Sequence, residues 1–189
     1  SRKRSYWKVV EELSAKSYRV IGVAVEEKGY LRLAGFIPMY DRPRKDSPKL
    51  ILELKELGIR VKMLTGDSAP IAVAVAKEVE IGGEVCRTGD VGKNIGRSVE
   101  KCDLFAEVFP EDKLRIVKSL QSKGQVVGMT GDGVNDAPVL KQAEVGIAVR
   151  SATDAARAAA SVVLTAEGLS GIVELVKTGR EAFQRMYTW

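Results

Sequence analysis

Two acidic residues, Asp132 and Asp136, lie four positions apart in the stretch MTGDGVNDAP, which follows the apolar segment GQVV. The same stretch contains two glycines and Asn135, and a bare turn needs neither the asparagine nor the second aspartate. Close carboxylates in a chain that has no histidine and only two cysteines favour a hard cation with oxygen ligands, most simply Mg²⁺. The stretch therefore predicts a cation site at the end of a buried strand.

A second turn of similar composition follows the apolar segment IRVKML, with Thr65, Gly66 and Asp67 in sequence. A threonine hydroxyl and free backbone N–H groups before a helix can cradle a phosphate. A phosphate beside a cation also needs a positive charge, and Lys113 stands at a helix start in FPEDKLRIVKSL. Taken alone, each feature has a structural explanation: Asp67 can cap the next helix, and Lys113 can simply be solvated.

Composition excludes several other kinds of chemistry. With 45% hydrophobic and 29% charged residues, the 189-residue chain is typical of a soluble globular domain. The absence of histidine removes His-based catalysis and most transition-metal sites. Cys86 and Cys102 are interpreted as two separate thiols, which suits a reducing cytoplasm better than a disulfide scaffold. A net charge of +5 and few aromatic residues give little support for nucleic-acid binding, and no G-x-G-x-x-G turn follows a strand. No apolar run reaches the ~18 residues of a membrane span, and the start lacks a signal-peptide core.

The elements that must position these turns alternate between strand and helix. After an expected helix at 6–16 and a hairpin of strands 18–25 and 31–37, the stretch MYDRPRKDSP breaks the pattern as a hinge would. The alternation then covers helices 47–57, 70–79, 111–123 and 135–143 and strands 59–64, 125–129, 145–149 and 161–164. Such alternation predicts an α/β domain with a mostly parallel sheet, whose ligands gather at the carboxyl ends of its strands. The last expected helix, 168–189, has no stop signal.

Three ordered strings carry a resemblance: MLTGDSAPIAVAVA, FAEVFPEDKLRIVKSLQ and VVGMTGDGVNDAPVLKQAEVGIAV. Together they resemble the phosphorylation domain of P-type ATPases, a membrane-pump branch of the haloacid-dehalogenase-like superfamily. The continuation from TDAARAAASVVL onward is most similar to the plasma-membrane proton-pump subfamily. The resemblance implies a Rossmann-like sheet flanked by helices, and a parent pump on the cytoplasmic face of the cell membrane. That pump would couple Mg-ATP hydrolysis to cation transport, with protons as the expected cation, through an aspartyl-phosphate intermediate.

The resemblance also implies a division of the chain. Residues 1–40 would be the carboxyl-terminal part of an α+β nucleotide-binding domain, and 41–46 a hinge. Residues 47–167 would be the phosphorylation domain, and 168–189 a stalk helix leading to a transmembrane domain that this chain lacks.

Roles for the site residues follow motif by motif. Thr65 and Gly66 match the residues that hold the transferred phosphoryl group, and Asp67 completes that motif. Lys113 matches the lysine that neutralises phosphate charge. Asp132 matches the Mg²⁺ ligand. Asn135 and Asp136 match the residues that order the site around that ligand.

The hinge and nucleotide contacts are implied in the same way. Asp41, Pro43 and Arg44 fit the family's Asp-Pro-Pro-Arg hinge motif, with Arg42 replacing one proline. Arg44 could still reach the nucleotide, and Arg19 matches an arginine that contacts ATP phosphates.

One part of the family's site is missing. The nucleophilic aspartate belongs to an Asp-Lys-Thr-Gly-Thr motif, which does not occur in these 189 residues. We therefore expect this fragment to be inactive alone and to need the preceding part of the same pump as its partner. The strand that carries the motif lies centrally in the family's sheet, so its removal should expose two rows of unpaired backbone groups. A soluble phosphatase of the same superfamily is the alternative function, and a non-catalytic nucleotide- or phosphate-binding module is a third.

Overall fold

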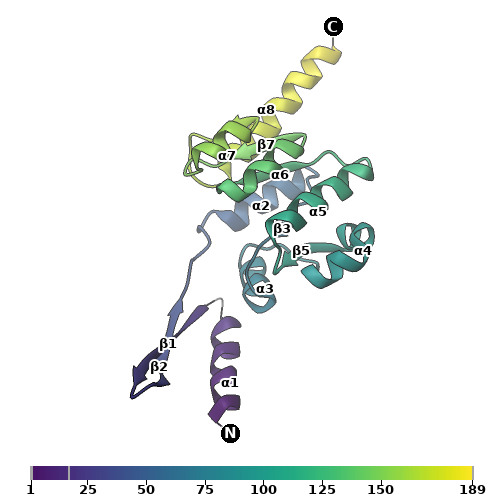
Figure 1. Ribbon diagram of the computed structural model, residues 1–189. Coiled ribbons are helices and arrows are strands. Elements are labelled where there is room, and N and C mark those ends of the chain that lie inside the picture. Colours follow the sequence, from purple (N-terminus) through teal and green to yellow (C-terminus); the bar gives the residue numbers. More distant parts are fainter. Residues whose placement is uncertain (1, 17, 189) are drawn as a thin grey trace.

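The computed structural model describes residues 2–16 and 18–188. Ser1 and Ser17 of the predicted segment 1–40, and Trp189 of the predicted segment 168–189, lie outside the described residues. Figure 1 shows two parts joined by an extended segment that leads into helix α2 (Ser47–Glu56). The smaller part holds helix α1 (Arg2–Ser14) and strands β1 (Arg19–Glu27) and β2 (Tyr30–Met39). The junction between the two parts therefore falls in the stretch that breaks the pattern of the sequence.

The predicted hairpin is present. Strands β1 and β2 pair antiparallel from Arg19 opposite Met39 to Glu27 opposite Tyr30. Lys28 and Gly29 form the connection, and both have a positive φ, 52° and 78°. That conformation suits a two-residue hairpin turn, because its twist matches the twist of the strands.

The larger part contains two separate three-stranded parallel sheets, confirming the predicted α/β class. The first has the order β3-β5-β4, and its elements are β3 (Met63–Leu64), α3 (Ala69–Glu78), β4 (Glu84–Arg87), α4 (Thr88–Lys101) and β5 (Cys102–Ala106). The second has the order β6-β7-β8, and its elements are α5 (Pro110–Ser122), β6 (Gly128–Gly131), the 3₁₀ turn η1 (Val134–Asp136), α6 (Ala137–Gln142), β7 (Val145–Ala148), α7 (Asp154–Ala159) and β8 (Val162–Val163). Within the described residues, β3 and β6 are both edge strands.

Two helices pack against both sheets. In α2, Ile51 joins the core that contains Leu104 of β5, while Leu54 joins the core that contains Ile147 of β7. In α5, Ile116 packs with the core around β5, and the next residue, Val117, packs with Val139 of α6. These two helices hold the sheets in one body although no strand-to-strand pairing joins them.

Several of the predicted strands are longer than the strands in the structure. The strand expected at 59–64 is reduced to Met63–Leu64, and the one expected at 125–129 appears as Gly128–Gly131. Both are edge strands with pairing on one side only, so the backbone has fewer opportunities for ladder bonds. The sequence pattern gave no prediction for β4, α4 and β5, because glycines interrupt the apolar periodicity there.

The interpretation of the cysteines as separate thiols was wrong. Cys86 of β4 and Cys102 of β5 form a disulfide, with Cα atoms 5.9 Å apart. They are 16 residues apart in the chain, but these strands are parallel neighbours, so the intervening helix returns the chain to the same place. Spacing alone could not indicate this pairing.

The last helix, α8 (Ser170–Tyr187), extends away from the sheets in Figure 1. Its first turns bury Ile172 and Val173, whereas Phe183, Met186 and Tyr187 near its end are exposed. Among the described residues, no helix is both long enough and apolar enough to cross a membrane.

Candidate active site

The turn that follows β3 is bonded to the segment that follows β5. Thr65 N–H donates to the Phe105 carbonyl (2.9 Å), and the Thr65 carbonyl accepts from Val108 N–H (3.0 Å). The Asp67 carbonyl accepts from Glu107 N–H (2.9 Å). Within the turn, the Thr65 hydroxyl donates to the Asp67 carboxylate and accepts from the Asp67 N–H, each at 3.1 Å. The positions of Thr65 and Asp67 are therefore set by the neighbouring strand as well as by the turn, and exposed Gly66 lies between them.

The turn that follows β6 is ordered around the buried side chain of Asp136. One carboxylate oxygen accepts from Lys113 Nζ at 2.8 Å, and the other accepts from the N–H groups of Asp132 and Gly133, each at 3.3 Å. Burial by itself would raise the Asp136 pKa, but the hydrogen bond and charge of Lys113, with these two backbone groups, hold the pKa below its ordinary value. The carboxylate is therefore engaged in ordering its own loop.

Gly131 is required by the same packing. A Cβ atom on Gly131 would lie 2.6 Å from the Cβ of Asp136, which is far inside van der Waals contact. The glycine thus lets the buried carboxylate approach the end of β6.

Asp132 and Asn135 are exposed, in contrast to Asp136. The backbone of Asp132 is anchored, because its carbonyl accepts from Thr153 N–H at 2.8 Å. Among the described residues, none donates a hydrogen bond to the Asp132 carboxylate. That carboxylate is available for a cation, while the Asp136 carboxylate is already bonded.

The donor set fits Mg²⁺ in part. Mg²⁺ commonly keeps several waters and binds one or two carboxylates together with substrate phosphate oxygens. The described residues contain no group of three or more acidic or cysteine side chains that could hold a metal ion by themselves. Asp132 is thus a fitting single ligand, and the remaining ligands would have to come from substrate, water and protein outside this chain.

One short segment connects the two turns. Glu107 and Val108 bond the turn at Thr65–Asp67, and α5 begins two residues later at Pro110. The first turn of α5 carries Lys113, which bonds Asp136. The structure therefore brings Lys113 to Asp136 directly and ties Thr65 to the start of the same helix.

The two arginines bind carboxylates of the larger part. Arg19 of β1 forms an ion pair with Asp67, so the hairpin contacts the turn after β3. Arg44 donates to Glu167 at 2.8 Å and lies 3.6 Å from Asp46. The hydrogen bond that Arg19 donates to Asp67 raises the Arg19 pKa, and the one that Arg44 donates to Glu167 raises the Arg44 pKa. Arg44 thus lies at the approach to α8 in this conformation.

The predicted hinge residues lie in the extended segment between β2 and α2. Asp41 is exposed and Pro43 half-buried. Just before them, the Tyr40 hydroxyl donates to Glu78 of α3 at 2.5 Å, and the Arg42 guanidinium lies 5.6 Å from the centre of the Tyr40 ring. The bond from Tyr40 to α3 therefore ties the start of the segment to the larger part.

Sequence reasoning missed Glu107. This residue has a φ of +60°, which is unusual for a residue other than glycine, and its carboxylate accepts from Ala69 N–H at the start of α3 (3.4 Å). Its backbone N–H also bonds Asp67. No motif in the sequence marks Glu107, because its importance comes from the meeting of β5 with a turn that is 40 residues earlier.

Comparison with known proteins finds matches over most of this chain. Two family models described as haloacid dehalogenase-like hydrolase match residues 3–144 and 113–176. A protein of Methanocaldococcus jannaschii named as a cation-transporting ATPase is 46% identical over 99% of this chain and 24% of its own length. Plasma membrane ATPase 1 of Saccharomyces cerevisiae is 44% identical over 98% of this chain and 21% of its own length.

A solved structure gives the same result in three dimensions. The crystal structure of a zinc-transporting PIB-type ATPase in its E2.Pi state superposes with a TM-score of 0.71 at 29% identity. The match covers 98% of this chain and 26% of that one. The chain belongs to the haloacid dehalogenase-like hydrolase family. More particularly, it is the haloacid-dehalogenase-like domain of a P-type ATPase, and it spans only 21 to 24% of the length of the two curated relatives described above.

Proposed function

We propose that this chain is the carboxyl-terminal portion of the ATP-hydrolysing unit of a cation pump, on the cytoplasmic face of the cell membrane. Protons are the cation we propose, because the relatives include plasma membrane ATPases of several yeasts and the carboxyl-terminal stretch resembles that branch. The rest of the pump, including its membrane domain, would lie in the sequence outside this chain. The coverage of the relatives supports this division.

The observation that carries the proposal is the division of the sheet. Strands β3 and β6 each have an unpaired edge among the described residues, and helices α2 and α5 each contact the cores of both sheets. One further parallel strand between β3 and β6 would join them into a continuous sheet and would satisfy both edges. That strand is where we place the aspartate of the Asp-Lys-Thr-Gly-Thr motif.

The position of this strand determines where phosphoryl transfer would occur. The carboxyl end of such a strand would lie between the turn at Thr65–Asp67 and the turn at Gly131–Asp136, where ligands of α/β sheets gather. The aspartate carboxylate would attack the γ-phosphorus of ATP, forming an acyl phosphate as the bond to ADP breaks, and water would later release phosphate.

The residues of this chain would position and neutralise the phosphoryl group. We assign the Thr65 hydroxyl and the Gly66 N–H to its equatorial oxygens, and Lys113 to its negative charge. Asp132 would hold Mg²⁺, which when bound supplies further neutralisation of phosphate charge. Asp136 and Asn135 would keep the loop in place, as the bonded and buried carboxylate of Asp136 supports.

The hairpin and the hinge would deliver the nucleotide. We assign Arg19 to the ATP phosphates, because its guanidinium already lies beside Asp67 of the proposed site. Arg44, with Asp41 and Pro43, belongs to the hinge in this proposal. A contact between Arg44 and the nucleotide would require Arg44 to release Glu167. The proposed domain division remains 1–40, 41–46, 47–167 and 168–189.

Phosphorylation of the longer protein tests the proposal. Incubation with Mg²⁺ and γ-labelled ATP, acid quench and hydroxylamine treatment should reveal a hydroxylamine-labile label. The Asp132→Asn variant should lose at least about 90% of that label, whereas the control Asp154→Asn, which changes another exposed carboxylate, on α7, should retain it. Near-normal labelling of Asp132→Asn would contradict the assignment. ATP-dependent acidification of reconstituted vesicles tests proton transport separately.

A further inference from the structure

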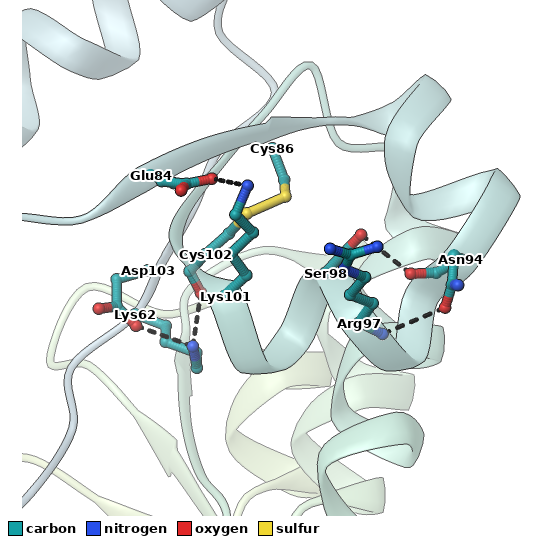
Figure 2. Close-up of a disulfide and its surroundings, with 9 residues drawn as sticks. All are labelled: Lys62, Glu84, Cys86, Asn94, Arg97, Ser98, Lys101, Cys102 and Asp103. Atoms are coloured by element: carbon teal, nitrogen blue, oxygen red, sulfur yellow. Dashed lines mark hydrogen bonds and ion pairs between the residues drawn. A yellow bond between two sulfur atoms is a disulfide. The ribbon is translucent and has the colours of Figure 1, made fainter.

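The disulfide between Cys86 and Cys102 joins β4 to β5 and has no part in the proposed chemistry. Figure 2 shows it between β4 and the start of β5, with Lys101 and Glu84 beside it. Both half-cystines belong to the core that contains Val99, Phe105 and Ile116, and their exposed fractions are 7% for Cys86 and 1% for Cys102. The sulfur atoms are therefore enclosed by apolar side chains.

The segment that this disulfide closes has weak intrinsic stability. Helix α4 contains three glycines, Gly89, Gly92 and Gly96, and glycine is among the poorest helix formers. The helix is also interrupted at Asn94, whose φ of −154° and ψ of 72° are not helical. Strand β4 is four residues long and pairs on one side only within the described residues. Local propensity therefore does little to keep β4 and α4 folded.

Noncovalent contacts also hold this segment: β4 pairs with β5, the Thr88 hydroxyl donates to the Glu107 carbonyl, and Glu100 of α4 pairs with Lys123 of α5. Lys101 and Glu84 form an ion pair at 2.5 Å across the ends of β4 and α4, but both side chains are more than half exposed, so solvent screens the pair. Val99 is the fully buried anchor of α4, with Ile95 packed beside it. On the other side, Lys62 donates to the Cys102 carbonyl at 2.5 Å and fixes the start of β5 rather than β4. A cross-link from β4 to β5 therefore adds a covalent constraint to the parallel pairing of these two strands.

We propose that oxidation of Cys86 and Cys102 produces a permanent structural cross-link. The disulfide does not act as a reversible redox switch. In the reaction, each thiol gives up one proton and one electron and a sulfur–sulfur bond forms. A low-molecular-weight disulfide accepts both protons and both electrons and leaves as two thiols. Enclosure of the sulfurs makes the product persistent, because a reducing thiolate must reach a sulfur atom directly.

Alkylation of free thiols in cells that naturally make the protein tests whether Cys86 and Cys102 form the disulfide. The cells are lysed in denaturant with excess alkylating reagent, and the protein is digested with trypsin without reduction. We expect one linked pair of peptides, Glu78–Arg87 with Cys102–Lys113, and less than about 10% alkylated cysteine, because an enclosed disulfide is not open to exchange. Recovery of both peptides in alkylated form would overturn the proposal.

The rate of reduction tests permanence. Dithiothreitol should reduce the folded protein at least about 100-fold more slowly than it reduces the same protein in denaturant, because opening of the core must come first. Equal rates would mean an accessible, switch-like disulfide and would overturn that part of the proposal.

Substitution tests the structural role. Cys86→Ala, Cys102→Ala and the double variant should each lower the midpoint of thermal unfolding by roughly 5–10 °C, because any of them opens the same loop. Protease cleavage should increase within 88–101 and not in α5. A double variant whose shift equals the sum of the two single shifts would mean that the cysteines act as independent packed thiols. The peptide mapping decides the question even if the variants do not fold.

Discussion

Lys113 Nζ lies 2.8 Å from one carboxylate oxygen of Asp136, and this contact joins the first turn of α5 to the turn after β6. Both side chains are largely removed from water, with exposed fractions of 22% and 9%. Since the same helix start is bonded to Thr65 through Val108, the pair fixes the separation of the two turns that carry the proposed site.

Loss of the lysine should therefore destabilise the protein and impair phosphorylation together. Lys113→Met leaves Asp136 buried without its main partner, at a cost of about 2 kcal/mol in the free energy of unfolding. Denaturant unfolding measures the cost, with Lys118→Met as the control, because Lys118 is exposed on the same helix. If the two variants unfold at the same denaturant concentration, the pair does not stabilise the loop.

The same contact predicts an acid limit of stability. The Asp136 pKa is lowered from 3.8 in the folded protein, so the unfolded state binds the proton more readily. The contribution of Asp136 to stability is then fully present at neutral pH, begins to fall as the pH approaches 3.8, and is lost as it passes through the lower folded pKa. Thermal unfolding from pH 7 to pH 3 should show this loss, and the loss should be much smaller in Asp136→Asn.

Close approach at Gly131 makes a steric prediction. Gly131→Ala places a methyl group 2.6 Å from the Asp136 Cβ, so the buried carboxylate or β6 must move. We expect a loss of about 1–3 kcal/mol in the free energy of unfolding. Gly82→Ala is the matched control, because a Cβ there meets no atom within 4 Å and Gly82 has no positive φ. Equal stability of the two variants would show that the loop adapts freely.

The contact between Arg19 and Asp67 predicts that loss of Arg19 changes the Mg-ATP concentration needed for phosphorylation. In the longer protein, Arg19→Ala should raise the Mg-ATP concentration for half-maximal phosphorylation about tenfold, the equivalent of one charged hydrogen bond. Arg32→Ala is the control, because Arg32 lies on the same hairpin and pairs within it to Glu27 at 3.2 Å. An unchanged requirement for Mg-ATP in Arg19→Ala would remove Arg19 from the proposed site.

The sequence by itself determined the class of fold and the order of its parts. Alternating apolar periodicities predicted the hairpin, most of the helices and the parallel strands other than β4 and β5, because these signals depend on residues close in the chain. The two acid- and glycine-containing turns were also visible, since each lies within a few residues of one strand. Their assignment to phosphate and Mg²⁺ remains a prediction.

Only the tertiary structure decided which distant residues meet. It separated two neighbouring carboxylates by environment, with Asp136 buried against Lys113 and Asp132 exposed, although both stand in one short motif. It also paired Cys86 with Cys102 and brought Glu107 to the turn at Asp67. The physical reason is the same in each case: parallel strands return the chain to one edge through a helix, so the contacts depend on strand order and packing rather than on spacing along the sequence.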